Sequence, residues 1–84
     1  MDQLVAQAPI RINGVVLIAI QRVRCEASQA FGAHCIDAAV EPRALVVHDG
    51  ASWRACDLDG RPLEVASMLT EVAGLSELVE REPE

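Results

Sequence analysis

Lysine and tyrosine are absent from this chain of 84 residues, and aromatic side chains make up only 2% of it. Without lysine, the chain has no Schiff-base nucleophile, no lysine general base and no P-loop lysine for a nucleoside triphosphate. With a single phenylalanine and a single tryptophan, the core has to be built from valine, leucine, isoleucine and alanine. An alanine-rich composition with arginine as the only base is typical of GC-rich bacterial genomes.

Long apolar runs are also missing. The longest one covers residues 15–20, whereas a membrane-spanning helix needs about twenty apolar residues. The first residues lack the basic segment that opens a signal peptide, and Pro9, Arg11 and Asn13 interrupt any apolar stretch there. We therefore expect no association with a membrane.

Positive charge is scarce, because 13 acidic residues outnumber seven arginines and the net charge is −6. A nucleic-acid-binding protein needs clustered positive charge to displace the counterions of the phosphates. The only close pair of bases is Arg22 and Arg24. We therefore expect no direct binding to DNA or RNA.

The cysteines are few, and none is closely spaced with another. Three cysteines, an odd number, argue against the disulfide framework of a small secreted protein and predict a reduced, cytoplasmic one. Structural zinc sites usually begin with two ligands a few residues apart. The chain has no Cys-x-x-Cys and no His-x-x-x-His sequence, and the adjacent His34 and Cys35 would project in different directions from a helix. His34, Cys35, His48 and Cys56 are weak candidates for a metal or thiol site, and we expect no cofactor.

The length allows one domain over residues 1–84, with polar ends at 1–3 and 80–84 that we expect to fray. Asn13-Gly14 is the strongest turn signal, because both residues tolerate the positive φ of a two-residue hairpin turn. It predicts that 10–12 pairs with 15–20. Past residue 20 the larger apolar side chains move from even to odd positions, which predicts a bulge or bend near Gln21-Arg22.

Residues 27–41 are open to two interpretations. Apolar residues recur at helical spacing from Ala27 to Ala39, and Pro42 would end a helix at Glu41. Gly32 in the middle of the segment argues against a helix, and 35–40 alone could form a strand. The alanine content favours the helix.

A second hairpin is predicted between 44–48 and 52–58, through Asp49-Gly50. Pro62 suits the first turn of a helix that reaches about residue 73. The expected order is β-β-α-β-β-α, an α+β protein with an antiparallel sheet of about four strands and two helices.

The strands at 15–20 and 44–47 are apolar at odd and even positions alike. Two short helices cover one face of a four-stranded sheet, and a sheet with its other face in water would alternate apolar and polar residues. The second face is therefore expected to meet a second copy, another protein or the sheet itself by curling. A homodimer is favoured, because soluble oligomers are most often symmetric dimers.

Four residues are the predicted contacts with a partner: Val15, Leu17, Trp53 and Arg54. Trp53 beside Arg54 has the composition of an interface anchor. The equally weighted alternative is that Trp53 closes one end of the core.

An enzymatic function is not expected. Cys56 stands beside Asp57, which disfavours the thiolate that a nucleophilic cysteine needs, and no Gly-x-Ser-x-Gly sequence accompanies His48. The sequence therefore predicts a small, non-catalytic interaction or accessory module that self-associates or docks on a protein partner. The alternatives are a thiol- or metal-binding protein and a protein that binds a small ligand between its sheet and a helix.

Overall fold

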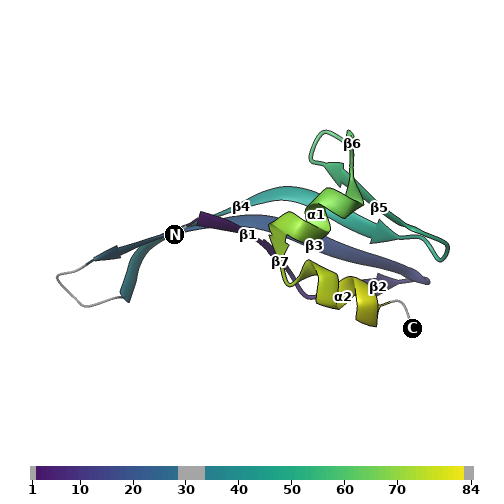
Figure 1. Ribbon diagram of the computed structural model, residues 1–84, viewed down its shortest axis with the longest axis horizontal. Helices are drawn as coiled ribbons and strands as arrows, with labels where there is room; N and C mark the ends of the chain where they lie inside the picture. The colour runs from purple at the N-terminus through teal and green to yellow at the C-terminus, as the bar shows by residue number, and fades with distance from the viewer. Residues whose placement is uncertain (1, 29–33, 83–84) are drawn as a thin grey trace.

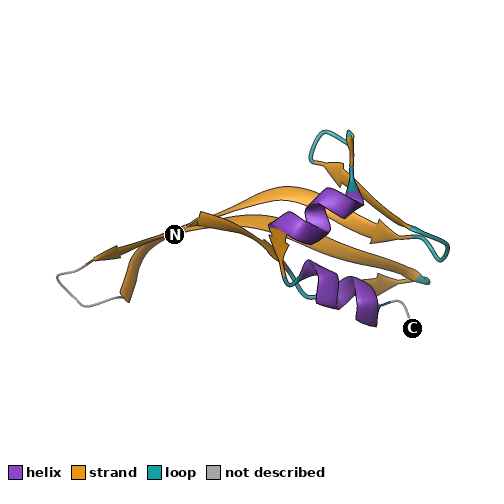
Figure 2. Ribbon diagram, in the orientation of Figure 1, coloured by secondary structure: helices purple, strands orange, loops and turns teal. Residues whose placement is uncertain are grey.

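The computed structural model describes residues 2–28 and 34–82, and for residues 26–28 and 34–38 it describes the backbone alone. The elements, in chain order, are β1 (Asp2–Ala6), β2 (Ile10–Ile12), β3 (Val15–Ser28), β4 (His34–His48), β5 (Trp53–Asp57), β6 (Pro62–Leu63), α1 (Val65–Glu71), β7 (Val72–Ala73) and α2 (Leu75–Arg81). Strands dominate, and both helices belong to the last quarter of the chain (Figure 2).

The sheet contains seven strands in the order β6-β5-β4-β3-β1-β7, and β2 also pairs with β3. Most neighbours are antiparallel, but β1 and β7 run parallel, with Leu4 opposite Val72. The predicted antiparallel sheet of about four strands is therefore wrong, although the coarser α+β class holds. The additional strands are short ones at the two ends of the chain and after β5, where few residues carry the pattern that identifies a strand.

The predicted helix over 27–41 is also wrong. Residues 27–28 belong to β3 and 34–41 to β4, and the part of this segment at 29–33 lies outside the described residues. β3 and β4 form one long antiparallel pair from Val16 opposite His48 to Ser28 opposite His34. Helix propensity is a weak preference that a long cross-strand ladder overrides. Figure 1 shows the far end of this pair reaching beyond the rest of the sheet as a two-stranded arm.

Both predicted hairpins are confirmed. Asn13 and Gly14 have φ values of 49° and 81°, and they connect β2 to β3 in the register that sets Ile12 opposite Val15. β4 and β5 pair from Ala44 opposite Asp57 to His48 opposite Trp53. The two turns therefore account for two pairs of strands, and the two-residue turn at Asn13-Gly14 also sets the register of its pair by local chemistry.

An irregularity lies where the change of apolar phase predicts it. Ile20 is opposite Ala44 and Gln21 is opposite Pro42, so Arg43 has no opposing residue in the ladder. The extra residue belongs to β4 rather than to β3. β3 therefore keeps a regular alternation of its two faces past the irregularity.

The core lies between the sheet and the two helices, which both lie on the same side of the sheet (Figure 1). Ile18 and Val46 from the sheet and Leu75 from α2 are fully buried. Met68 of α1 and Val72 of β7 complete the contact between the two layers. Each helix has seven residues, too few to be stable alone, so both depend on this packing.

Candidate functional site

The two faces of β3 have different surroundings. Val16, Ile18 and Ile20 are between 0% and 2% exposed beneath the helices. Val15, Leu17 and Ala19 point to the opposite face, because successive strand residues alternate, and they are only half-buried. Apolar residues at both parities of 15–20 thus serve a core on one face and a second apolar surface on the other.

Cross-strand pairing extends this second surface over the neighbouring strands. Leu17 is opposite Ile10 of β2 and Val47 of β4, and opposed residues point to the same side of a sheet. We call this surface the open face. Its apolar residues on β1 to β5 include Val5, Ile10, Ile12, Val15, Leu17, Ala19, Val23, Cys25, Val40, Leu45, Val47 and Cys56.

The open face is apolar and partly accessible to solvent. Ile10, Ile12 and Val40 are 56%, 52% and 56% exposed. Among the paired strand residues described with their side chains, Arg54 is the only charged one on this face. Contiguous exposed apolar surfaces are typical of interaction sites. No helix in the described ranges 2–28 and 34–82 lies over it.

The structure brings three of the four predicted partner contacts together. Val15, Leu17 and Arg54 lie on the open face, and the Arg54 side chain is 77% exposed. Trp53 lies on the opposite, helix-covered face with its ring edge-on to that of His48, at 4.9 Å between centroids. The position of Trp53 fits the alternative interpretation, in which it closes one end of the core.

Ile10 and Ile12 were not identified from the sequence as surface residues. The signal was nevertheless available, because a two-residue turn at Asn13-Gly14 fixes the register of the hairpin. That register sets Ile10 opposite Leu17 and Ile12 opposite Val15. Both isoleucines therefore belong to the same face as the two predicted contacts.

The turn from β4 to β5 is held by two polar side chains. The Gly50 amide donates a hydrogen bond to Nδ1 of His48 at 3.1 Å, which helps to hold the turn. The Asp49 carboxylate accepts hydrogen bonds from the Ala51 and Ser52 amides at 2.9 and 3.1 Å. His48 and Asp49 are thus accounted for by turn geometry.

The hydrogen bonds to the Asp49 carboxylate should make the stability of the fold depend on pH. Hydrogen bonds from the Ala51 and Ser52 amides hold the pKa of Asp49 below its ordinary value of 3.8. Because the folded-state pKa is lowered, this stabilisation is present above the unfolded-state value and is lost as the pH falls through the folded-state pKa. We expect Asp49→Ala to lower the melting temperature at pH 7 and to match the wild type at pH 2.

Thermal melts between pH 2 and pH 7 check this expectation. Glu80→Gln, which removes a negative charge from the exposed surface of α2, is the control, and its melting temperature should follow that of the wild type. A difference between Asp49→Ala and the wild type that persists unchanged at pH 2 would show that the carboxylate charge is not the cause.

The weak metal and thiol candidates do not come together in the described structure. His48 is opposite Trp53 on the helix-covered face, whereas Cys56 is opposite Leu45 on the open face. The side chains of His34 and Cys35 fall outside the described part of the chain. No group of three or more His, Cys, Asp or Glu residues suited to a metal ion occurs among the described residues.

The cysteines differ in state. Cys25 is disulfide-bonded, which the odd cysteine count did not lead us to expect, and Cys56 is a half-buried free thiol. The sequence-based expectation of uniformly reduced cysteines is therefore not met in this structure.

The two neighbouring arginines are paired with carboxylates. Arg22 donates two hydrogen bonds to Asp2, at 2.9 and 2.6 Å, and Arg24 lies 3.5 Å from Glu41. The bond to Arg22 lowers the pKa of Asp2. Each positive charge thus faces a negative one on the same surface, which leaves little net charge to attract a phosphate backbone.

Within the described residues, neither helix has the length and apolar character needed to cross a membrane. Comparison with known proteins adds no relative: no family model, curated protein or solved structure matches the chain.

Proposed function

We propose that this chain is a small, non-catalytic interaction module that forms a homodimer through its open face. The observation that carries the proposal is that the sheet has one apolar face buried under the helices and a second apolar face, on which Arg54 is the only charged residue among the paired strand residues described with their side chains. The covered face accounts for the fold of the monomer, so the second face needs a different explanation.

The size of the open face suits a dimer. The open face comprises the three residues of β2, the five of β5 and about nine each of β3 and β4. At roughly 3.3 Å per residue and about 4.8 Å between strands, these span a projected area on the order of 400 Å². Side-chain relief makes the accessible area larger than the projection, and a standard interface buries about 800 Å² on each partner. An isologous contact of this face with itself therefore falls at the lower end of the size range of specific interfaces, about 1,000 Å² in total.

A second copy is the preferred partner because the open face offers no charge pattern that a differently charged protein would recognise. Interfaces between identical subunits have more apolar, less charged cores than transient ones. A cytoplasmic location and the absence of nucleic-acid binding stay predictions from the composition.

Solution mass tests the proposal. Sedimentation or light scattering of the wild type should give twice the 9.0 kDa mass of the chain. Leu17→Glu should shift the protein to monomer by weakening the dimer at least about a hundredfold, since it buries an unpaired charge at the centre of the interface. Leu58→Glu is the matched control, because Leu58 is 64% exposed and lies off the open face.

A further variant guards against loss of folding. Leu17→Thr introduces a β-branched side chain suited to a strand and should weaken the dimer by a smaller factor while the far-ultraviolet spectrum is retained. A wild type that stays a 9.0 kDa monomer at millimolar concentration contradicts the proposal, as does equal dissociation by Leu17→Glu and Leu58→Glu.

A further inference from the structure

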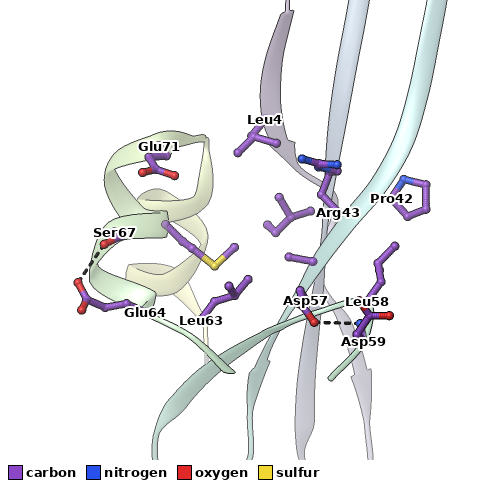
Figure 3. A pocket seen from close by; sticks show the side chains of 13 residues that line it. Leu4, Pro42, Arg43, Asp57, Leu58, Asp59, Leu63, Glu64, Ser67 and Glu71 are labelled. Carbon is purple, nitrogen blue, oxygen red and sulfur yellow. Dashed lines mark hydrogen bonds between the residues drawn. The ribbon is translucent and has the colours of Figure 1, made fainter. Parts of the chain in front are cut away.

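A groove of about 590 Å³ lies between α1 and the sheet, on the face opposite the open face. Figure 3 shows Glu64, Ser67 and Glu71 of the α1 segment on one side and Arg43 and Asp57 on the other. A cavity of this volume is typical of sites for small molecules.

The groove exists because of two features of the sheet beside it. β5 ends at Asp57, opposite Ala44. In the described sheet, β4 therefore has no neighbour on that side from Arg43 back to His34. Ala44 has a small side chain and Arg43 stands outside the ladder. No large side chain therefore fills the space between the sheet and α1.

The floor of the groove is apolar. Leu4 and Ile20 come from the sheet, and Met68 comes from α1. Ile20 and Met68 are 1% and 7% exposed, so they form a firm base rather than mobile surface side chains. Leu58 and Leu63 also line the groove and are 64% and 39% exposed, so an apolar ligand segment here would bury surface that is otherwise in contact with water.

The rim is negatively charged. Asp57, Asp59, Glu64 and Glu71 line the groove together with a single base, Arg43. Asp57 accepts hydrogen bonds from the Asp59 and Arg61 amides at 2.9 Å, and Glu64 accepts one from Ser67 at 2.9 Å. Two of the four carboxylates are therefore fixed in position by the protein itself.

Glu71 has no evident role in stabilising α1. It is the last residue of the helix, whose last turn contains no basic residue, and a carboxylate at a helix C-terminus opposes the helix dipole. Its position at the rim instead adds negative charge beside the apolar floor (Figure 3).

We propose that this groove binds a small organic cation with an apolar body, such as an alkylamine. The cationic group lies at the rim next to Glu71, on the α1 side of the groove (Figure 3), and the apolar body lies against Leu4 and Leu63, over the buried Ile20 and Met68. The complementarity is one of charge at the rim and of apolar area at the floor. The site is separate from the open face, so it does not depend on the proposed dimer.

The probe is n-octylammonium, added to the full-length, ¹⁵N-labelled protein, with amide shifts followed by NMR. We expect saturable shifts confined to residues around Leu4 and Ile20 and in the ranges 42–44, 57–59 and 63–71. Octanoate, which has an anionic head group on a similar chain, should bind at least about tenfold more weakly, because the rim repels it.

Matched variants test the role of the rim. Glu71→Gln should weaken octylammonium binding by about two- to fivefold, as expected for one partly screened charge, and added salt should reduce the difference. Glu80→Gln makes the same change on α2 away from the groove and should leave the affinity unchanged.

Three results would overturn the proposal. The first is the absence of saturable shifts at these residues, and the second is equal affinity for octylammonium and octanoate. The third is tighter binding of a short lysine–leucine peptide than of octylammonium, which would assign the groove to a protein segment instead. A monomeric protein that binds octylammonium as expected would contradict the dimer and leave the groove intact.

Discussion

Ile18→Ala is expected to reduce the free energy of unfolding by about 2–5 kcal/mol. Ile18 is 0% exposed on the central strand β3, and its replacement removes packing atoms and leaves a cavity beneath the helices. Domains of this size have total stabilities on the order of 5–10 kcal/mol. The variant should therefore unfold at a much lower urea concentration, with an unchanged slope if the denatured state is unaffected.

Leu17→Ala is the control for this result, because it truncates the adjacent side chain on the opposite face of the same strand. Leu17 is only half-buried within one chain, so at concentrations where the protein is monomeric the cost should be near 1 kcal/mol. Equal costs for the two variants would mean that one chain buries both faces of β3 equally. That outcome would remove the physical basis of the open face.

The sequence predicts the hairpins well because their determinants are local. Asn13-Gly14 and Asp49-Gly50 encode chain reversal within a few residues, and the structure has a turn at both places. The predicted irregularity near Gln21-Arg22 also lies where expected, although the extra residue, Arg43, is on the partner strand. A change of phase in one strand does not reveal which of two paired strands carries the insertion.

The remaining errors concern elements that depend on distant partners. Residues 34–41 have an alanine-rich helical pattern, but pairing with β3 stabilises them as a strand. β1 and β7 are short, and β7 pairs in parallel with a strand almost seventy residues earlier in the chain. Such contacts depend on the tertiary arrangement, which local propensity does not encode.

The candidate site could be predicted only in part, because some of its residues are placed by contacts distant in the sequence. Apolar residues at both parities of 15–20 require two apolar surfaces, and this correctly implies that two helices cover only one. The sequence left two interpretations of Trp53 open, an interface contact or the end of the core, because of the turn between β4 and β5. Four residues separate His48 from Trp53, and a loop of that length does not by itself define the register and hence the facing of β5.

Leu75→Ala is the second substitution for which we expect a large effect. Leu75 is the first residue of α2 and is 0% exposed. A helix of seven residues has too few hydrogen bonds to persist without tertiary contacts, so α2 depends on the burial of Leu75 together with the half-buried Leu78 and Val79. We expect a loss of about 2–5 kcal/mol in the free energy of unfolding.

The same substitution should reduce the helical circular-dichroism signal before the sheet unfolds, because α2 can detach while β3 and β4 stay paired. Ser76→Ala, at the next and exposed position, is the control and should change stability by less than about 0.5 kcal/mol. Arg11 and Glu82 form an ion pair between β2 and the residue after α2, but an exposed pair contributes too little to hold the helix alone. If α2 stays fully helical in Leu75→Ala, contacts other than the core must hold it, and the dependence of these short helices on a single covered face of the sheet would be refuted.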